Sequence, residues 1–149
     1  MFELIEVISS KQDHVEYLFE LLKKKKFNIS HEELPSFDDH SKFVKNHSYR
    51  KWYLLSINSK LAGSIYLTNS NIIGLNISSN KINDYVNAMQ LIVKRHKPLP
   101  PVKSERSKYF LVNANPNNYC LINALKILNM NHIQNTYAFA ESDQIKSDN

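Results

Sequence analysis

The sequence KYFLVNANPNNYCLINALKILNM (Lys108–Met130) decides the fold that we predict for this chain. Tyr109–Val112 is a short apolar run of the kind found in strands, and Asn113–Asn118 is rich in turn residues. Apolar side chains then recur at the three- and four-residue spacing of one helical face, at Leu121, Ile122, Leu125 and Leu128. Asn115 fits the N-cap of this helix and Pro116 its first position, where a missing N–H costs nothing. The stretch therefore predicts a strand, a tight turn and an amphipathic helix.

Length and composition restrict the class of protein. The chain has 149 residues, of which 42% are hydrophobic, so it is large enough for one domain with a buried core. Its single cysteine, Cys120, excludes an intrachain disulfide and a multi-thiolate zinc site, and a cytoplasmic location is expected. We expect no membrane span, because no apolar run approaches about 18 residues. The N-terminal MFELIEVISS lacks a basic leader, so we expect a first strand there rather than a signal peptide.

Charge and glycine content restrict the classes of function that the chain can have. A net charge of +5 is compatible with nucleic acid, an anionic membrane or a phosphorylated ligand, and a mildly basic enzyme is the preferred interpretation. A nucleic-acid partner is the weakest option, because the sequence has no aromatic-basic RNA motif and no helix-turn-helix signature. The only two glycines, Gly63 and Gly74, lie too far apart for a P-loop or a G-x-G-x-x-G motif.

The remaining elements follow from periodicity and capping residues. Strands are predicted at Phe2–Ile8, Lys51–Asn58, Leu61–Leu67, Ile72–Ser78 and Ile133–Ala140. Helices are predicted from His14 to about Lys25 after an Asp13 cap, from Ser36 to about Lys45, and from Ile82 to about Arg95. The order β-α-α-β-β-β-α-β-α-β predicts an α/β (α+β) fold, a mixed, mainly antiparallel sheet with helices on both faces. We expect one domain over residues 1–140 and a polar, frayed tail over 141–149.

Two groups of residues could carry chemistry, and each has a structural alternative. His31 and Glu33 lie together in a loop, with His40 in the following helix, and a His–carboxylate pair can accept a proton from an amine. No metal is expected, because these residues lack the spacing of a helical metal motif. On spacing alone, a core-edge role for His40 and a loop hydrogen bond for His31 are favoured. Cys120 could be a nucleophile at a helix N-terminus, but a structural cysteine is preferred.

A longer pattern then adds a resemblance. HEELPSFDDHSKFVKNHSYRKWYLL (His31–Leu55) resembles the S-H-x-x-x-P-S-x-x-x-H-x-x-F-V and Y-R-x-W-Y-L pattern of a bacterial subgroup of the GNAT superfamily, the acyl-CoA-dependent N-acyltransferases. The matching residues are Ser30, His31, Pro35, Ser36, His40, Phe43, Val44, Tyr49, Arg50, Trp52, Tyr53 and Leu54. The element order and Asn115-Pro116-x-Asn118 before an apolar helix also resemble this superfamily.

The resemblance implies an N-acyltransferase with acetyl-CoA as its co-substrate. Acyl-CoA would lie in a gap between Ile72–Ser78 and Tyr109–Asn113, and a small-molecule amine, such as that of an amino sugar, would attack the thioester directly. The implied catalytic residues are His31, Glu33 and Asn113. The implied cofactor-binding residues are Asn76, Ile77, Ser78, Asn83, Tyr85, Asn115 and Asn118. The partners considered also include a second copy of this chain, in a homodimer.

The sequence departs from the superfamily pattern at two places. Where the pyrophosphate loop R/Q-x-x-G-x-G/A is expected, Asn80, Asn83 and Tyr85 replace the arginine or glutamine and the two glycines. In the last helix, Leu125 stands where many members have a tyrosine that protonates the thiolate. The alternative function is therefore a GNAT-fold binding or regulatory protein without acyl-CoA activity. A Tyr85 ring that fills the channel beside Asn83 would favour this alternative.

Overall fold

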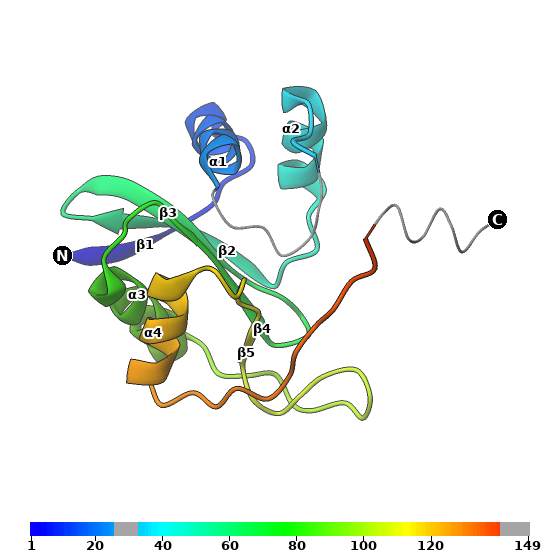
Figure 1. Ribbon diagram of the computed structural model, residues 1–149. Coiled ribbons are helices and arrows are strands. Elements are labelled where there is room, and N and C mark those ends of the chain that lie inside the picture. The colour runs from blue at the N-terminus through cyan, green and yellow to red at the C-terminus, as the bar shows by residue number, and fades with distance from the viewer. Residues whose placement is uncertain (26–32, 141–149) are drawn as a thin grey trace.

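The computed structural model describes residues 1–25 and 33–140 (Figure 1). Its elements in chain order are β1 (Phe2–Glu6), α1 (Gln12–Lys24), α2 (Phe37–Asn46), β2 (Lys51–Ile57), β3 (Lys60–Leu67), β4 (Ile72–Ile77), α3 (Ile82–Arg95), β5 (Leu111–Val112) and α4 (Tyr119–Ile127). No helix among the described residues has the length and apolar character needed to cross a bilayer.

The strands form one sheet in the order β1-β2-β3-β4-β5. The first four strands are antiparallel neighbours, and β5 runs parallel to β4. The β2–β3 turn is tight because Asn58 and Ser59 both adopt positive φ angles, of 51° and 67°, as a type I′ turn requires. This mixed, mainly antiparallel sheet confirms the predicted fold class.

The two faces of the sheet are covered by different helices (Figure 1). Trp52 and Leu54 of β2 pack with α1 and α2 in one apolar core. Tyr53 and Leu55, which alternate with them, pack with α3 and α4 in the other core. The helices on both faces that the element order predicts are therefore present.

Local capping explains α2 better than α1. The Ser36 hydroxyl accepts a hydrogen bond from the Asp39 N–H at 3.1 Å, which confirms the predicted cap of α2. The predicted Asp13 cap of α1 is wrong, because the helix begins at Gln12 and Asp13 lies in its first turn. The turn that enters the helix is held by the Lys11 N–H, which donates to the Ile8 carbonyl at 3.0 Å, and by His14 Nδ1, which accepts the Ile8 N–H at 3.0 Å.

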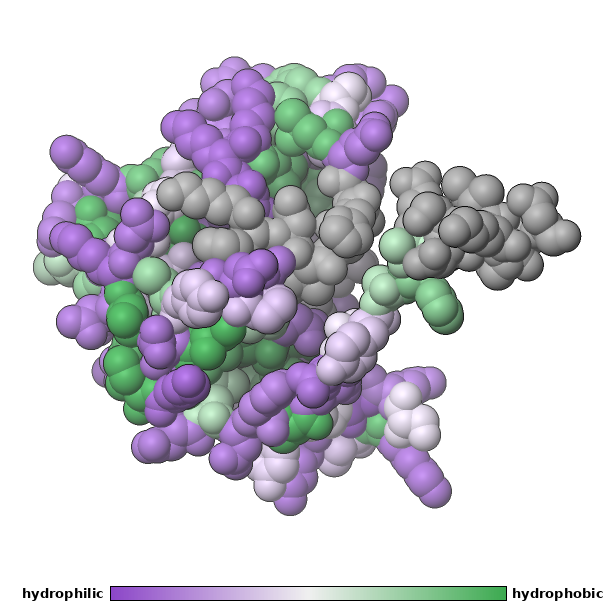
Figure 2. Space-filling view, viewed as in Figure 1, coloured by the Kyte–Doolittle hydropathy of each residue, from purple (hydrophilic) through white to green (hydrophobic). Residues whose placement is uncertain are grey.

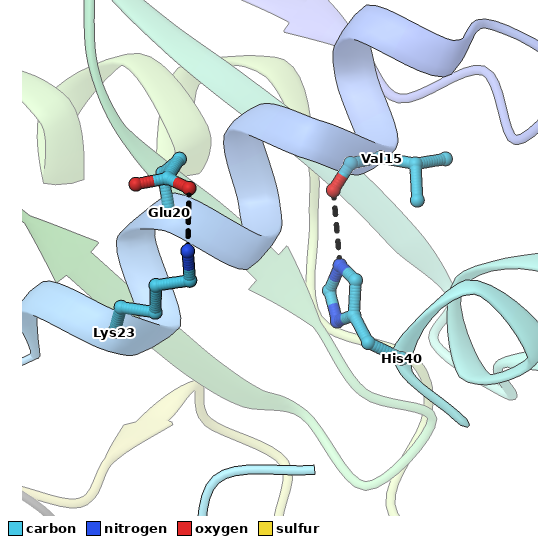
Figure 3. Close-up of polar contacts among 4 residues, drawn as sticks. All are labelled: Val15, Glu20, Lys23 and His40. Atoms are coloured by element: carbon cyan, nitrogen blue, oxygen red, sulfur yellow. Dashed lines mark hydrogen bonds and ion pairs between the residues drawn. The ribbon is translucent and has the colours of Figure 1, made fainter. Parts of the chain in front are cut away.

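His40 joins the two helices on the upper face. Its side chain is buried, and its Nε2 lies 3.0 Å from the Val15 carbonyl oxygen, to which it donates (Figure 3). Burial lowers the pKa of His40 below its ordinary value of 6.5, and the Val15 bond offsets this only in part. The structural role that spacing favoured for His40 is therefore the one it has.

This histidine makes stability depend on pH. The native state holds His40 neutral, whereas the unfolded chain binds a proton below about pH 6.5, so stability is full above that pH and falls below it. We expect the melting temperature to drop between pH 7.5 and 5.5 in differential scanning calorimetry, with a shallower drop in His40→Gln, which keeps a donor near the Val15 carbonyl. An unchanged slope in His40→Gln would show that other groups set the pH dependence.

The start of α4 differs from the prediction. Asn118, not Asn115, is the N-cap, and its Oδ1 accepts the Leu121 N–H at 3.3 Å. Pro116 instead occupies the second position of a turn closed by the Asn118 N–H and the Asn115 carbonyl, 2.9 Å apart. The helix ends before Met130 because Asn129 adopts a positive φ of 58°.

The predicted last strand, Ile133–Ala140, is wrong. Residues 131–140 have no regular secondary structure and are all exposed, with Ile133, Tyr137 and Phe139 between 73% and 88% exposed. The alternation of side chains is strand-like, but a strand also needs a backbone partner, and β5 offers an edge only two residues long. The predicted tail, 141–149, lies outside the described residues.

Candidate functional site

The gap between β4 and β5 is the main irregularity of the sheet. β5 pairs with β4 only at Ile72↔Leu111 and Ile73↔Val112. The following residues of β4, Gly74–Ile77, pair with β3 on one side and have no partner in the described β5 on the other. A parallel pair that ends after two residues leaves the following strand backbone groups without a partner strand, which is the arrangement that a ligand can extend as an added strand.

The backbone groups that face this gap follow from the alternation of the strand. The Ile72 carbonyl accepts the Thr68 N–H at 2.9 Å, so the backbone N–H and C=O groups of even-numbered residues of β4 are directed toward β3. The Asn71 carbonyl accepts the Leu111 N–H at 2.8 Å, so odd-numbered residues point toward β5. Leu75 and Ile77 therefore present their N–H and C=O groups to the gap.

This alternation shows which of the three cofactor-binding residues that we expected on this strand direct their backbone groups into the gap. The backbone of Asn76 bonds to β3, and its side-chain amide reaches the Leu21 carbonyl at 3.4 Å. Ser78 donates both its N–H and its hydroxyl to the Ala62 carbonyl, each at 2.9 Å. Only Ile77 turns its backbone toward the gap. Leu75, which does the same, was missed, although counting the alternation from the Thr68–Asn71 turn could have found it.

The first turn of α3 borders the same gap. Asn83 is exposed there, and Lys81, at the N-cap, contributes no side-chain cap. The Asp84 N–H donates to the Lys81 carbonyl at 3.1 Å, which leaves the Ile82 and Asn83 amides to an anion. Tyr85 is buried, and its hydroxyl donates to the Ile77 carbonyl at 3.2 Å. Burial is the main cause that raises the pKa of this phenol, with smaller contributions from nearby Cys120 and Asp84, so the hydroxyl stays protonated and keeps this bond.

The N-terminus of α4 meets the loop that precedes α3. The Cys120 thiol donates to the Asn80 carbonyl at 3.2 Å, which favours the structural alternative for this cysteine. Asn118 caps α4 beside it, and Asn115, whose Oδ1 accepts the Asn117 N–H at 2.9 Å, orders the preceding turn. The positive ends of two helix dipoles therefore converge at the open end of the gap.

The expected catalytic residues are less well placed. Asn113 is exposed and directly follows β5, at the gap. Glu33 is exposed in the segment before α2. His31 lies outside the described residues. Among residues 1–25 and 33–140, no three His, Cys, Asp or Glu side chains form a group that could hold a metal.

Comparison with known proteins rests on structure. No protein-family model and no curated protein matches this sequence. Three solved structures superpose well. The N-acetyltransferase PseH of Campylobacter jejuni, in complex with acetyl coenzyme A, matches at a TM-score of 0.61 and 16% identity, over 91% of this chain and 92% of its own. RimL, a ribosomal-protein alpha-N-acetyltransferase in complex with coenzyme A, matches at 0.59 and 16%, over 85% and 77%. An integron cassette protein of V. cholerae matches at 0.61 and 15%, over 99% and 97%.

The chain has the GNAT fold. At 16% identity or less, these neighbours establish the GNAT fold of the chain. Its activity has to be argued from the candidate site. Two of them were solved with coenzyme A or acetyl coenzyme A bound. Of the three departures from the pyrophosphate-loop pattern, Asn80 precedes α3, whereas Asn83 and Tyr85 lie at its start, the first exposed and the second buried.

Proposed function

We propose that this protein is an acetyl-CoA-dependent N-acetyltransferase that acts on an amine of a small molecule, such as an amino sugar. The observation that supports it most is the two-residue pairing of β4 with β5, beyond which the backbone of Leu75 and Ile77 has no partner strand on the β5 side. The converging N-termini of α3 and α4 supply donors and positive potential for a pyrophosphate. In this proposal the enzyme works in the cytoplasm.

The chemistry needs little from side chains. The amine nitrogen attacks the thioester carbonyl carbon, the C–N bond forms, and the C–S bond breaks as the thiolate leaves. A backbone N–H of β4 at the gap polarises the carbonyl oxygen. Glu33 or His31 takes the proton lost by the amine, and water supplies the proton that neutralises the leaving thiolate. Asn113, which is exposed directly after β5, orients the acetyl group or the amine in this proposal.

The second candidate is a GNAT-fold binding or regulatory protein without acyl-CoA activity, and Tyr85 favours it. The Tyr85 hydroxyl already occupies the Ile77 carbonyl, one of the acceptors that face the gap. A pantetheine amide could bond to this carbonyl only alongside the phenol or by displacing it. Acyl-CoA binding would then be weakened or lost while the fold stays intact.

A thiol-release assay separates the two candidates. Acetyl-CoA is incubated with the protein and a panel of amines that includes amino sugars, and free coenzyme A is measured with a chromogenic disulfide. The enzyme proposal expects release that depends on both an amine and the protein. Absence of release with every amine would reject the enzyme proposal and favour the second candidate, for which calorimetry should show weak acetyl-CoA binding or none.

The charge at the start of α3 gives a gain-of-affinity prediction. Asp84 lies in the first turn, where its carboxylate would repel a pyrophosphate at the helix N-terminus. We expect Asp84→Asn to bind acetyl-CoA about 2- to 5-fold more tightly, from roughly 0.5–1 kcal/mol of relieved repulsion. Calorimetric titration measures this, and pantetheine, which lacks the pyrophosphate, should show no gain. Equal affinity in Asp84→Asn would place the pyrophosphate elsewhere.

We also propose a homodimer. Ile133, Tyr137 and Phe139 expose large apolar surfaces, and further apolar patches lie over the region of α3 and α4 on the face seen in Figure 2. A second copy would cover the exposed segment. Light scattering should give twice the chain mass for the wild type and a single mass for the Tyr137→Lys, Phe139→Lys double variant. A monomeric wild type at about 100 μM would contradict the dimer.

A further inference from the structure

The pairing of β4 and β5 is too short to fix its own register. Two residue pairs join the strands, and a parallel ladder of this length contributes little, because each hydrogen bond adds only about 1 kcal/mol. A slip of one residue would turn every following side chain and backbone group of β5 to the opposite direction. The geometry of the gap must therefore be held by something outside the ladder.

Asn71, directly before β4, makes the bonds that could do this. Its backbone carbonyl accepts the Leu111 N–H of β5 at 2.8 Å. Its side-chain amide donates to the carbonyls of Leu99 and Ser107 at 2.9 and 2.8 Å. Its Oδ1 accepts the Leu99 N–H at 2.8 Å. One residue thus joins β4, β5 and both ends of the loop between α3 and β5.

The environment of Asn71 makes these bonds strong and specific. The residue is 0% exposed, so its three side-chain bonds do not compete with water, and losing one would leave a buried polar group unbonded. Its φ is 63°, a left-handed conformation that asparagine tolerates better than most residues. Two half-buried arginines give further support to the loop: Arg50 donates to the Lys97 carbonyl at 2.9 Å, and Arg106 to the Pro100 carbonyl at 2.6 Å.

We propose that Asn71 is the positioning residue that sets the register and opening of the gap between β4 and β5. It touches neither Leu75 nor Ile77, and acts by placing β5 opposite them. The consequence for cofactor binding rests on the proposed function, whereas the hold on β5 can be measured without any ligand.

The test compares Asn71→Asp with Asn69→Asp. Asn69 lies in the same turn and also donates its amide to a carbonyl, that of Ser48 at 3.0 Å, but it is exposed and its side chain makes no bond to the α3–β5 loop. Asn71→Asp keeps the shape of the side chain and replaces its donors by acceptors that face two carbonyls. If this variant does not fold, Asn71→Gly keeps the left-handed backbone and removes the side chain alone.

Two readouts are taken well below the melting temperature. In hydrogen exchange, the Leu111 amide should exchange at least about 10-fold faster in the Asn71 variant and unchanged in Asn69→Asp. In calorimetry, acetyl-CoA should bind at least about 10-fold more weakly to the Asn71 variant only. A variant that merely lowers global stability would leave the affinity of the folded protein unchanged.

The outcomes separate the two proposals. If the wild type binds no acetyl-CoA, the proposed function fails and the exchange of Leu111 still decides the role of Asn71. If the wild type binds and the Asn71 variant matches Asn69→Asp in both readouts, the role proposed for Asn71 is overturned. Faster exchange at Leu111 with unchanged affinity would also overturn it, because β5 would then not control the site.

Discussion

Replacement of Leu75 by proline is expected to weaken acetyl-CoA binding at least about 10-fold while the sheet stays folded. Proline removes the N–H that Leu75 directs into the gap and places ring atoms there instead. The pairing with β3 survives, because the Leu75 N–H points away from that strand. Calorimetric titration of the purified variant with acetyl-CoA measures the effect.

Two matched variants isolate the backbone group. Leu75→Ala loses similar apolar packing but keeps the N–H, so it should bind acetyl-CoA as the wild type does. Asn76→Pro removes an N–H that bonds to β3 and should cost about 3 kcal/mol or more and lose the sheet signal in circular dichroism. Equal affinity of Leu75→Pro and Leu75→Ala would show that the cofactor does not use this strand.

Replacement of Gly74 by alanine is expected to cost about 3 kcal/mol of stability and lower the melting temperature by roughly 10 °C. A Cβ at Gly74 would overlap the ring of Tyr66, which lies across the glycine. The ring cannot swing away freely, because Tyr49 stacks on it with centroids 4.1 Å apart and planes 5° from parallel. Thermal unfolding monitored by calorimetry gives the loss.

A double-mutant cycle tests this cause. Tyr66→Ala removes the ring, so Gly74→Ala should cost almost no stability in the Tyr66→Ala background, with a coupling energy of about 2–3 kcal/mol. Gly63→Ala is the control, since an added Cβ there would lie 2.5 Å from the Asn76 carbonyl oxygen, a backbone atom. Tyr66→Ala should give Gly63→Ala no relief. Full additivity of Gly74→Ala and Tyr66→Ala would rule out the ring as the obstacle.

Elements with local signals were predictable from the sequence. The Ser36 cap, the hairpin at Asn58 and Ser59 and the helix Ile82–Arg95 depend on residues close together in the chain, and the structure has all three. The prediction of a strand at Ile133–Ala140 failed because the alternating pattern can be read locally, whereas the strand edge it would pair with depends on distant parts of the chain. The α4 cap moved from Asn115 to Asn118 because two competing caps flank one proline.

Tyr85 shows how two kinds of inference can disagree. Its helical spacing with Met89 and Ile92 predicts a buried side chain, and the structure buries all three. The alignment with the superfamily pattern placed the same residue among the cofactor-binding groups. Which atoms of β4 face the gap was equally beyond a motif, because it depends on the register with β3 and on the anchoring of β5.

The central claim is that the gap between β4 and β5 binds acyl-CoA. The most direct measurement is calorimetric titration of the wild-type protein with acetyl-CoA, supported by the melting temperature at about 1 mM ligand. We predict one site per chain and, for a micromolar-range Kd, a stabilisation of roughly 3 kcal/mol at that concentration. Absence of both binding heat and any rise in melting temperature would contradict the account, and the GNAT fold would then serve a function without acyl-CoA.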